Sequence, residues 1–198
     1  MKTLINLFAG FMLIIIAQNL NAQSIKSVDG IFLTEQDYKS DKPSVCLDTK
    51  DRIQLNEFFA GKYVTVRCQG QITKLSKNDI YGYRLQSENF RLFNNEAYKI
   101  IDTSGFQLYS RKKLSIKGKG YSHVTKYFYS VGTQKPILNL TIENLLGSFP
   151  DQTNFRYSIQ NSFYKDGDLM AYDKQAGQYK IKYLYFQHRQ LKVTHTTL

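Results

Sequence analysis

The sequence predicts an α+β fold in which an antiparallel β meander of about six to eight strands precedes about two or three short C-terminal helices. The first observation is that aromatic and aliphatic residues recur at short intervals between residues 79 and 110. Turn-forming residues punctuate this stretch, namely Gly82, Asn94–Asn95 and Thr103-Ser104-Gly105. The second observation is that the alternating pattern ends after Gly132, where the spacing of apolar residues becomes helical. The strands form either an open sheet or one that closes into a barrel.

The N-terminal part of the expected domain combines a short apolar element with a helical turn. The apolar residues Gly30-Ile31-Phe32-Leu33 precede Thr34, which is a favourable helix N-cap. Glu35 and Asp37 follow it directly, and acidic side chains stabilise the first turn of a helix. We therefore expect a turn of helix after Thr34, followed by a polar loop that ends at Pro43.

Strands account for most of residues 30–131. Residues 63–68 alternate with a period of two, which places Val64, Val66 and Cys68 on one face. We expect a pair of strands within residues 80–93, a second pair within residues 98–110 and a single strand at residues 124–131. Gly105 supplies the left-handed residue that a three-residue hairpin loop requires.

Helices are expected within residues 141–175. Thr141 is a suitable N-cap for the first helix, and Pro150 ends it. In the second helix Phe155, Ile159 and Phe163 are spaced four apart, so they share one face. The tail at residues 176–198 is ambiguous, because residues 179–186 fit either a strand or a helix lying on the sheet.

Residues 1–22 have the pattern of a secretory signal peptide. Lys2 supplies a positive start, residues 4–17 are almost entirely apolar, and Ala22 is a small residue suited to cleavage. A retained membrane anchor is the alternative, but the apolar run is shorter than the roughly 20 residues of a spanning helix. We expect cleavage and export to the periplasm or medium, leaving residues 23–198 as a single domain with no transmembrane segment.

Cys46 and Cys68 are the only two cysteines. An oxidising compartment would allow them to pair, and closing this loop would stabilise the fold by roughly 3 kcal/mol in the chain-entropy model. The alternative is two free thiols, because unpaired cysteine is readily buried. We favour the disulfide, and the spacing does not suggest a zinc site.

The chain is basic, and its cations are concentrated in one stretch. The net charge is +11, and loss of Lys2 with the signal peptide would leave 26 basic against 16 acidic side chains, or +10. The stretch 111–126 contains no acidic residue and holds six cations: Arg111, Lys112, Lys113, Lys117, Lys119 and Lys126. We interpret it as an anion-binding candidate for a lipid, a glycan or an acidic protein rather than a nucleic acid. The alternative is a solvated hairpin whose lysines only prevent aggregation.

Catalytic and metal motifs are not recognisable in the sequence. It has three histidines and lacks nucleophile-elbow, zinc-ligand and phosphate-loop motifs. Asp166-Gly167-Asp168 resembles only a fragment of a calcium loop, and a turn explains it better. We therefore expect no cofactor, no metal and no catalytic residues, and lean towards a non-enzymatic protein.

Two other functions stay open. A tyrosine-rich sheet could line a small-ligand cavity, bordered by Tyr81, Tyr83, Tyr127 and Tyr129. A hydrolase could instead use loop carboxylates, for which the sequence offers two pairs: Glu35 with Asp37, and Asp79 with Glu88.

Three segments resemble small exported proteins of Bacteroidota-type bacteria. They are Asn21-Ala22-Gln23, Gly30-Ile31-Phe32-Leu33-Thr34 and Asp79-Ile80-Tyr81-Gly82-Tyr83. The resemblance covers the signal and part of the sheet, and it implies export without implying any functional residue.

Overall fold

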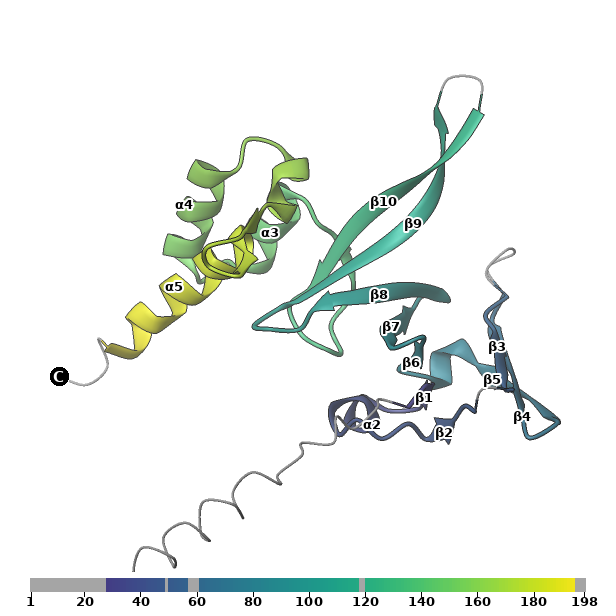
Figure 1. Cartoon of the computed structure of the whole chain (residues 1–198). Helices are drawn as coiled ribbons and strands as arrows, with labels where there is room; N and C mark the ends of the chain where they lie inside the picture. Colours follow the sequence, from purple (N-terminus) through teal and green to yellow (C-terminus); the bar gives the residue numbers. More distant parts are fainter. Residues whose placement is uncertain (1–27, 49, 57–60, 118–119, 195–198) are drawn as a thin grey trace, which may run out of the picture.

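The computed structural model describes residues 28–48, 50–56, 61–117 and 120–194 (Figure 1). The expected signal peptide therefore lies outside the described residues, as does Lys119. The strands are β1 (Gly30–Phe32), β2 (Val45–Cys46), β3 (Arg52–Gln54), β4 (Tyr63–Cys68), β5 (Gln71–Ser76), β6 (Gly82–Leu85), β7 (Glu88–Phe93), β8 (Glu96–Asp102), β9 (Gln107–Lys117), β10 (Gly120–Ser130), β11 (Leu138–Asn139), β12 (Tyr172–Asp173) and β13 (Gln178–Tyr179). The helices are α2 (Glu35–Lys39), η3 (Lys77–Asp79), α3 (Ile142–Ser148), α4 (Thr153–Ser162), η4 (Asp166–Met170) and α5 (Lys180–Thr194).

Eight antiparallel strands form the main sheet, in the order β11-β10-β9-β8-β7-β6-β1-β2. Strands β6 to β11 are neighbours in the order in which they occur along the chain, and most of the helices follow them, so the α+β prediction is confirmed. Within the described residues the sheet is open, with β11 and β2 at its edges, and it does not close into a barrel.

Tight turns connect the central strands, and each of these turns contains residues in the left-handed region of backbone conformation. Gln86 and Ser87 (φ 53° and 64°) join β6 to β7, and Asn94 and Asn95 (φ 49° and 62°) join β7 to β8. Positive φ at two successive residues is typical of the two-residue turns whose twist suits a β-hairpin. The expected left-handed residue in the next loop is confirmed, since Gly105 has φ 69°.

A separate three-stranded sheet, β3-β4-β5, packs against the main one. The expected burial of Val64 and Val66 is confirmed, and they belong to the same buried cluster as Tyr83 and Leu92 of the main sheet. The sequence pattern assigned these strands to the same sheet as the rest, which is wrong. Alternation shows which side chains are buried, but it does not show whether another strand or a second layer buries them.

The two faces of the main sheet differ. The register places Tyr83, Phe90, Leu108 and Tyr129 on one face, which we call the helix-bearing face. Its β8–β10 part packs against α3, α4 and α5, and its β6–β8 part packs against the small sheet (Figure 1). The opposite face, which we call the arginine face, carries large polar and aromatic side chains that include Arg84, Arg91, Tyr98, Tyr109 and Phe128.

The helices form largely where the caps and the apolar spacing predict them. Thr141 accepts a hydrogen bond from the Asn144 backbone N–H at 3.1 Å and begins α3. The predicted apolar stripe of the second helix is confirmed, because Phe155, Ile159 and Phe163 are all buried. The ambiguous tail is a short strand followed by a 15-residue helix, α5.

The predicted disulfide is not formed. Both Cys46 and Cys68 are free thiols. The Sγ of Cys68 lies 3.7 Å from the Cys46 backbone carbonyl oxygen, while the Sγ of Cys46 faces the Pro43 carbonyl oxygen at 3.9 Å. The two residues are neighbours, but each sulfur is directed at a backbone oxygen. Proximity of the chain segments therefore does not produce the sulfur geometry that a disulfide requires.

Within the part of the chain that the structure describes, no helix has the length and apolar character needed to cross a membrane.

Candidate functional site

The basic stretch 111–126 forms the outer part of a long hairpin. Strands β9 and β10 have 11 residues each and pair throughout, from Gln107 opposite Ser130 to Lys117 opposite Gly120. Strand β8 pairs with β9 only as far as Ser110. Beyond that residue the hairpin extends as a two-stranded ribbon past the rest of the fold (Figure 1).

The structure distributes the predicted cations unequally. Lys112, Lys113 and Lys126 are exposed. Arg111 is half-buried and forms an ion pair with Glu96 across the sheet, and its guanidinium lies 5.8 Å from the centre of the Tyr98 ring. Because its charge is already paired, Arg111 helps to hold the base of the hairpin rather than to present a free cation. Lys117 ends β9, and Lys119 lies outside the described residues.

The ion pair at the base of the hairpin lowers the pKa of Glu96. Burial by itself would raise this pKa, but the hydrogen bonds from Arg111 and Tyr98 and the positive charge of Arg111 outweigh it. Burial and the same carboxylate raise the pKa of Tyr98 to about 12. The hairpin is therefore anchored to β8 by a charged contact that persists over the physiological pH range.

An exposed apolar surface lies on the hairpin as well, and the pattern of charged residues in the sequence does not reveal it. Leu114, Ile116 and Tyr121 are 63%, 74% and 78% exposed. Ile116 pairs directly with Tyr121, and Leu114 pairs with His123. The three apolar side chains share one face, while Arg111, Lys113 and Lys126 lie on the other. The alternation of apolar and polar residues was visible in the sequence, but it normally indicates a buried face.

Two adjoining pockets lie at the foot of the hairpin on the helix-bearing face. One, of about 410 Å³, is lined by residues that include Tyr83, Phe90 and Ala97 and the cations Lys99, Arg111 and Lys112. The next, of about 460 Å³, includes Tyr127, Met170 and Tyr179. Three residues line both: Lys99, Ser110 and Thr125.

The four tyrosines that the small-ligand hypothesis assigned to one cavity are separated. Tyr83 lines the first pocket and stacks on Phe90 with 4.8 Å between the ring centres, while Tyr127 lines the second. Tyr129 is fully buried in the helical core, and Tyr81 lies in neither lining. The described pockets therefore do not bring these four rings together.

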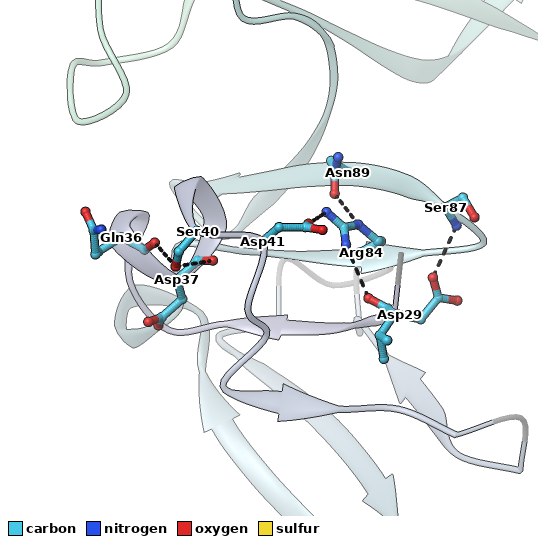
Figure 2. Close-up of polar contacts among 9 residues, drawn as sticks. Asp29, Gln36, Asp37, Ser40, Asp41, Arg84, Ser87 and Asn89 are labelled. Atoms are coloured by element: carbon cyan, nitrogen blue, oxygen red, sulfur yellow. Dashed lines mark hydrogen bonds and ion pairs between the residues drawn. The ribbon is translucent and has the colours of Figure 1, made fainter. Parts of the chain in front are cut away.

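A second polar cluster surrounds Arg84 on the arginine face (Figure 2). Arg84 is 5% exposed and donates Nε to Asn89 Oδ1 at 2.8 Å. Its other nitrogens reach the Val28 carbonyl oxygen at 3.4 Å and the Asp41 carboxylate, with which it forms an ion pair. Asp29 accepts the Ser87 backbone N–H at 3.2 Å.

These contacts fasten the N-terminal segment to the β6–β7 turn. The adjoining pocket, of about 430 Å³, has Tyr38, Lys39, Gln107 and Thr133 in its lining. Because Nε and both Nη atoms of Arg84 already bond to protein oxygens, we interpret this cluster as structural.

Arg91 is the second buried arginine, with 4% exposure. Among the described residues it donates to neutral groups: the Tyr109 hydroxyl at 3.0 Å, the Ser130 hydroxyl at 3.3 Å and the Lys135 carbonyl oxygen at 2.9 Å. These bonds tie β7 to β9, to β10 and to the loop that follows β10. The sequence could not identify either arginine, because alternation does not distinguish a buried polar side chain from an exposed one.

The structure also brings Ser158 of α4 within 2.6 Å of His188 Nε2 on α5. A nucleophile and a base at this distance are two parts of a catalytic triad. The other ring nitrogen, Nδ1, is buried without a hydrogen-bond partner among the described residues, so no group orients the imidazole. We interpret the contact as a bond between the two helices.

The acidic pairs of the hydrolase hypothesis have other contacts. Hydrogen bonds from Lys39 and Thr133 lower the pKa of Glu35, and bonds from Ser44 and from Thr34 lower that of Asp37. A general acid needs a raised pKa. Glu88 forms an ion pair with Lys99. Within the described residues, no group of three or more metal-ligating side chains is present.

Comparison with protein-family models, curated proteins and solved structures found no match. The fold and the hairpin by themselves define the class: an α+β protein with a projecting, cationic and amphipathic β-hairpin.

Proposed function

We propose that this is an exported, non-enzymatic protein that associates with anionic components of the cell envelope through the β9–β10 hairpin. Export is inferred from residues 1–22 and from the resemblance to small exported proteins of Bacteroidota-type bacteria. Residence in the periplasm or the medium follows from the same segment. The proposed surface consists of the exposed cations Lys112, Lys113 and Lys126.

One observation carries the proposal: a projecting ribbon bears exposed lysines, and the sequence from 111 to 126 contains no acidic residue to neutralise them. Glu96, which lies against the base of the ribbon, is paired with Arg111. A cation that projects from the protein approaches a flat anionic surface without desolvating the rest of the fold. Each lysine near an anionic lipid surface contributes about 1 kcal/mol, within a Debye length of about 8–10 Å.

The test compares two triple variants with the same net charge. The hairpin variant is Lys112→Gln, Lys113→Gln, Lys126→Gln, and the matched control replaces three exposed lysines elsewhere, Lys42, Lys74 and Lys174, by Gln. Binding to vesicles with about one-third anionic phospholipid is measured by co-sedimentation at low salt. The hairpin variant should bind about 100-fold more weakly, since three lysines contribute about 3 kcal/mol.

The control variant should lose far less, because its lysines are scattered over other surfaces. Equal losses in the two variants would show that only net charge matters. Unchanged binding of the hairpin variant to both anionic vesicles and heparin resin would remove the hairpin from the proposal.

A further inference from the structure

The apolar side chains of the hairpin are ordered by distance from the body of the protein. The Ile116–Tyr121 pair is outermost, the Leu114–His123 pair follows, and Lys112 lies opposite Thr125 nearer the sheet. All three apolar side chains are more than half exposed. Isolated apolar residues on a surface need no explanation, but three on one face at the end of a projecting ribbon form a continuous apolar surface.

The register also sets the spacing between apolar and charged groups. Four residues separate Ile116 from Lys112, which at about 3.4 Å per residue places them roughly 14 Å apart along the strand. The interfacial layer on each side of a bilayer is roughly 5–8 Å thick. When Ile116 is at the edge of the hydrocarbon, the backbone of Lys112 therefore lies roughly 6–9 Å outside this layer, within about one Debye length of the phosphates. Tyr121, beside Ile116, is of the residue type enriched at this boundary.

We propose that the anionic partner of the hairpin is a phospholipid bilayer, and that Ile116, Tyr121 and Leu114 enter its interfacial layer while the lysines attract the headgroups electrostatically. This inference rests on the proposed function and specifies its partner. Insertion is shallow, because the outer edges of a two-stranded ribbon present backbone N–H and C=O groups that cannot be left unpaired in hydrocarbon.

Other partners fit the surface less well. A second copy of the chain would bring one cationic hairpin against another, which electrostatic repulsion opposes. A soluble polyanion would pair with the lysines but leave the three apolar side chains in water. An acidic protein would need a cavity shaped to receive a projecting ribbon, whereas a bilayer yields to it. The combination of an apolar surface near the outer end of the ribbon with cations along the same hairpin is the pattern of interfacial membrane binding.

A tryptophan reporter tests the insertion directly. The chain contains no tryptophan, so Tyr121→Trp in the purified protein introduces a single indole fluorophore at the outer end of the hairpin. The matched control is Tyr164→Trp, at a site that is 91% exposed and follows α4. With anionic vesicles the emission of the Tyr121→Trp protein should shift to the blue, lose quenching by acrylamide and be quenched by lipids labelled near the headgroup. The emission of the Tyr164→Trp protein should change in none of these ways.

A second variant separates apolar from charged contacts. Leu114→Thr, Ile116→Thr, Tyr121→Thr keeps every cation and retains residues with high strand propensity. It should bind anionic vesicles about tenfold more weakly, equivalent to about 1.4 kcal/mol, and should bind heparin resin as before.

The outcomes distinguish the inference from the proposed function. If the Tyr121→Trp protein sediments with anionic vesicles but its indole emission stays unshifted and open to acrylamide, the insertion is wrong while charge-based binding remains. Quenching by labels deep in the acyl chains would also overturn shallow insertion. If the threonine substitutions leave vesicle binding unchanged, the apolar surface does not contact lipid. If the protein dimerises with increasing concentration and these substitutions abolish the dimer, the apolar surface is a contact between two copies of the chain. Absence of binding to any anionic surface would instead refute the proposed function.

Discussion

Lys182 provides a test of the packing between α5 and the sheet. Its side chain is fully buried, and its ammonium lies 4.1 Å from the centre of the Phe106 ring. It donates to the Ser104 carbonyl oxygen at 2.6 Å and to the Phe106 carbonyl oxygen, and the Asp102 carboxylate is 3.5 Å away. Burial lowers the pKa of Lys182 to about 8, although Asp102 opposes the shift.

This pKa makes stability depend on pH in an unusual direction. Unfolded lysine keeps its proton up to about pH 10.5, whereas folded Lys182 loses it near pH 8. Between these values the unfolded state binds more protons, so the free energy of unfolding rises with pH. From pH 7 to pH 9 the expected gain from this one group is roughly 1 kcal/mol, at 1.36 kcal/mol per pKa unit. Below pH 7 the contribution is constant.

The assay is urea unfolding at pH 7, 8 and 9 with reductant, comparing the protein with Lys182→Met. Burial raises the pKa values of Tyr38, Tyr129 and Tyr179, and of the Cys68 thiol, and these groups are common to both proteins. Their contributions therefore cancel in the difference. That difference should change by roughly 1 kcal/mol in favour of the lysine protein between pH 7 and pH 9. If the free energy of unfolding depends on pH in the same way in both proteins, Lys182 is not buried as a charged group between α5 and the sheet.

Two further predictions concern backbone space and thiol chemistry. Gly82→Ala should destabilise the protein by about 3 kcal/mol or more in urea unfolding, at or above the top of the usual range for overpacking, since a Cβ at this position would lie 2.1 Å from the Phe90 carbonyl oxygen. In the control Gly147→Ala, in α3, the added Cβ would have no atom within 4 Å, so this change should instead stabilise the protein by about 0.5–1 kcal/mol. Equal changes in stability for the two variants would contradict the close packing at Gly82. Without reductant both cysteines should be alkylated in the folded protein, Cys46 faster because it is exposed and Cys68 slower because burial and Asp51 raise its pKa. Mass spectrometry that finds neither alkylated would instead indicate the disulfide.

Local signals in the sequence predicted the local structure well. Thr34 and Thr141 cap helices as expected, because a hydroxyl at that position satisfies free backbone N–H groups whatever the surroundings. Alternation located β4, and Gly105 marked a hairpin loop. The connection after β6 is a two-residue turn at Gln86–Ser87. Neither residue is a glycine, so its left-handed conformation was not apparent.

The candidate site was predicted only in part. The sequence identified the basic stretch and its lack of acidic residues. It did not show that Glu96 neutralises Arg111, because these residues meet only through the β8–β9 pairing. It also did not show that Leu114 and Ile116 are exposed, since the same alternation would indicate a buried face if another layer covered the ribbon.

By itself the sequence determined the α+β class, the location of the main strands and caps, and the sign of the charge on the hairpin. Tertiary structure alone decided which faces are covered, and therefore that Arg84, Arg91 and Lys182 are buried while Leu114, Ile116 and Tyr121 are exposed. The physical reason is that propensity and capping act within a few residues of the chain. Burial depends on layers assembled from segments tens of residues apart, and so does the surface left available for a partner.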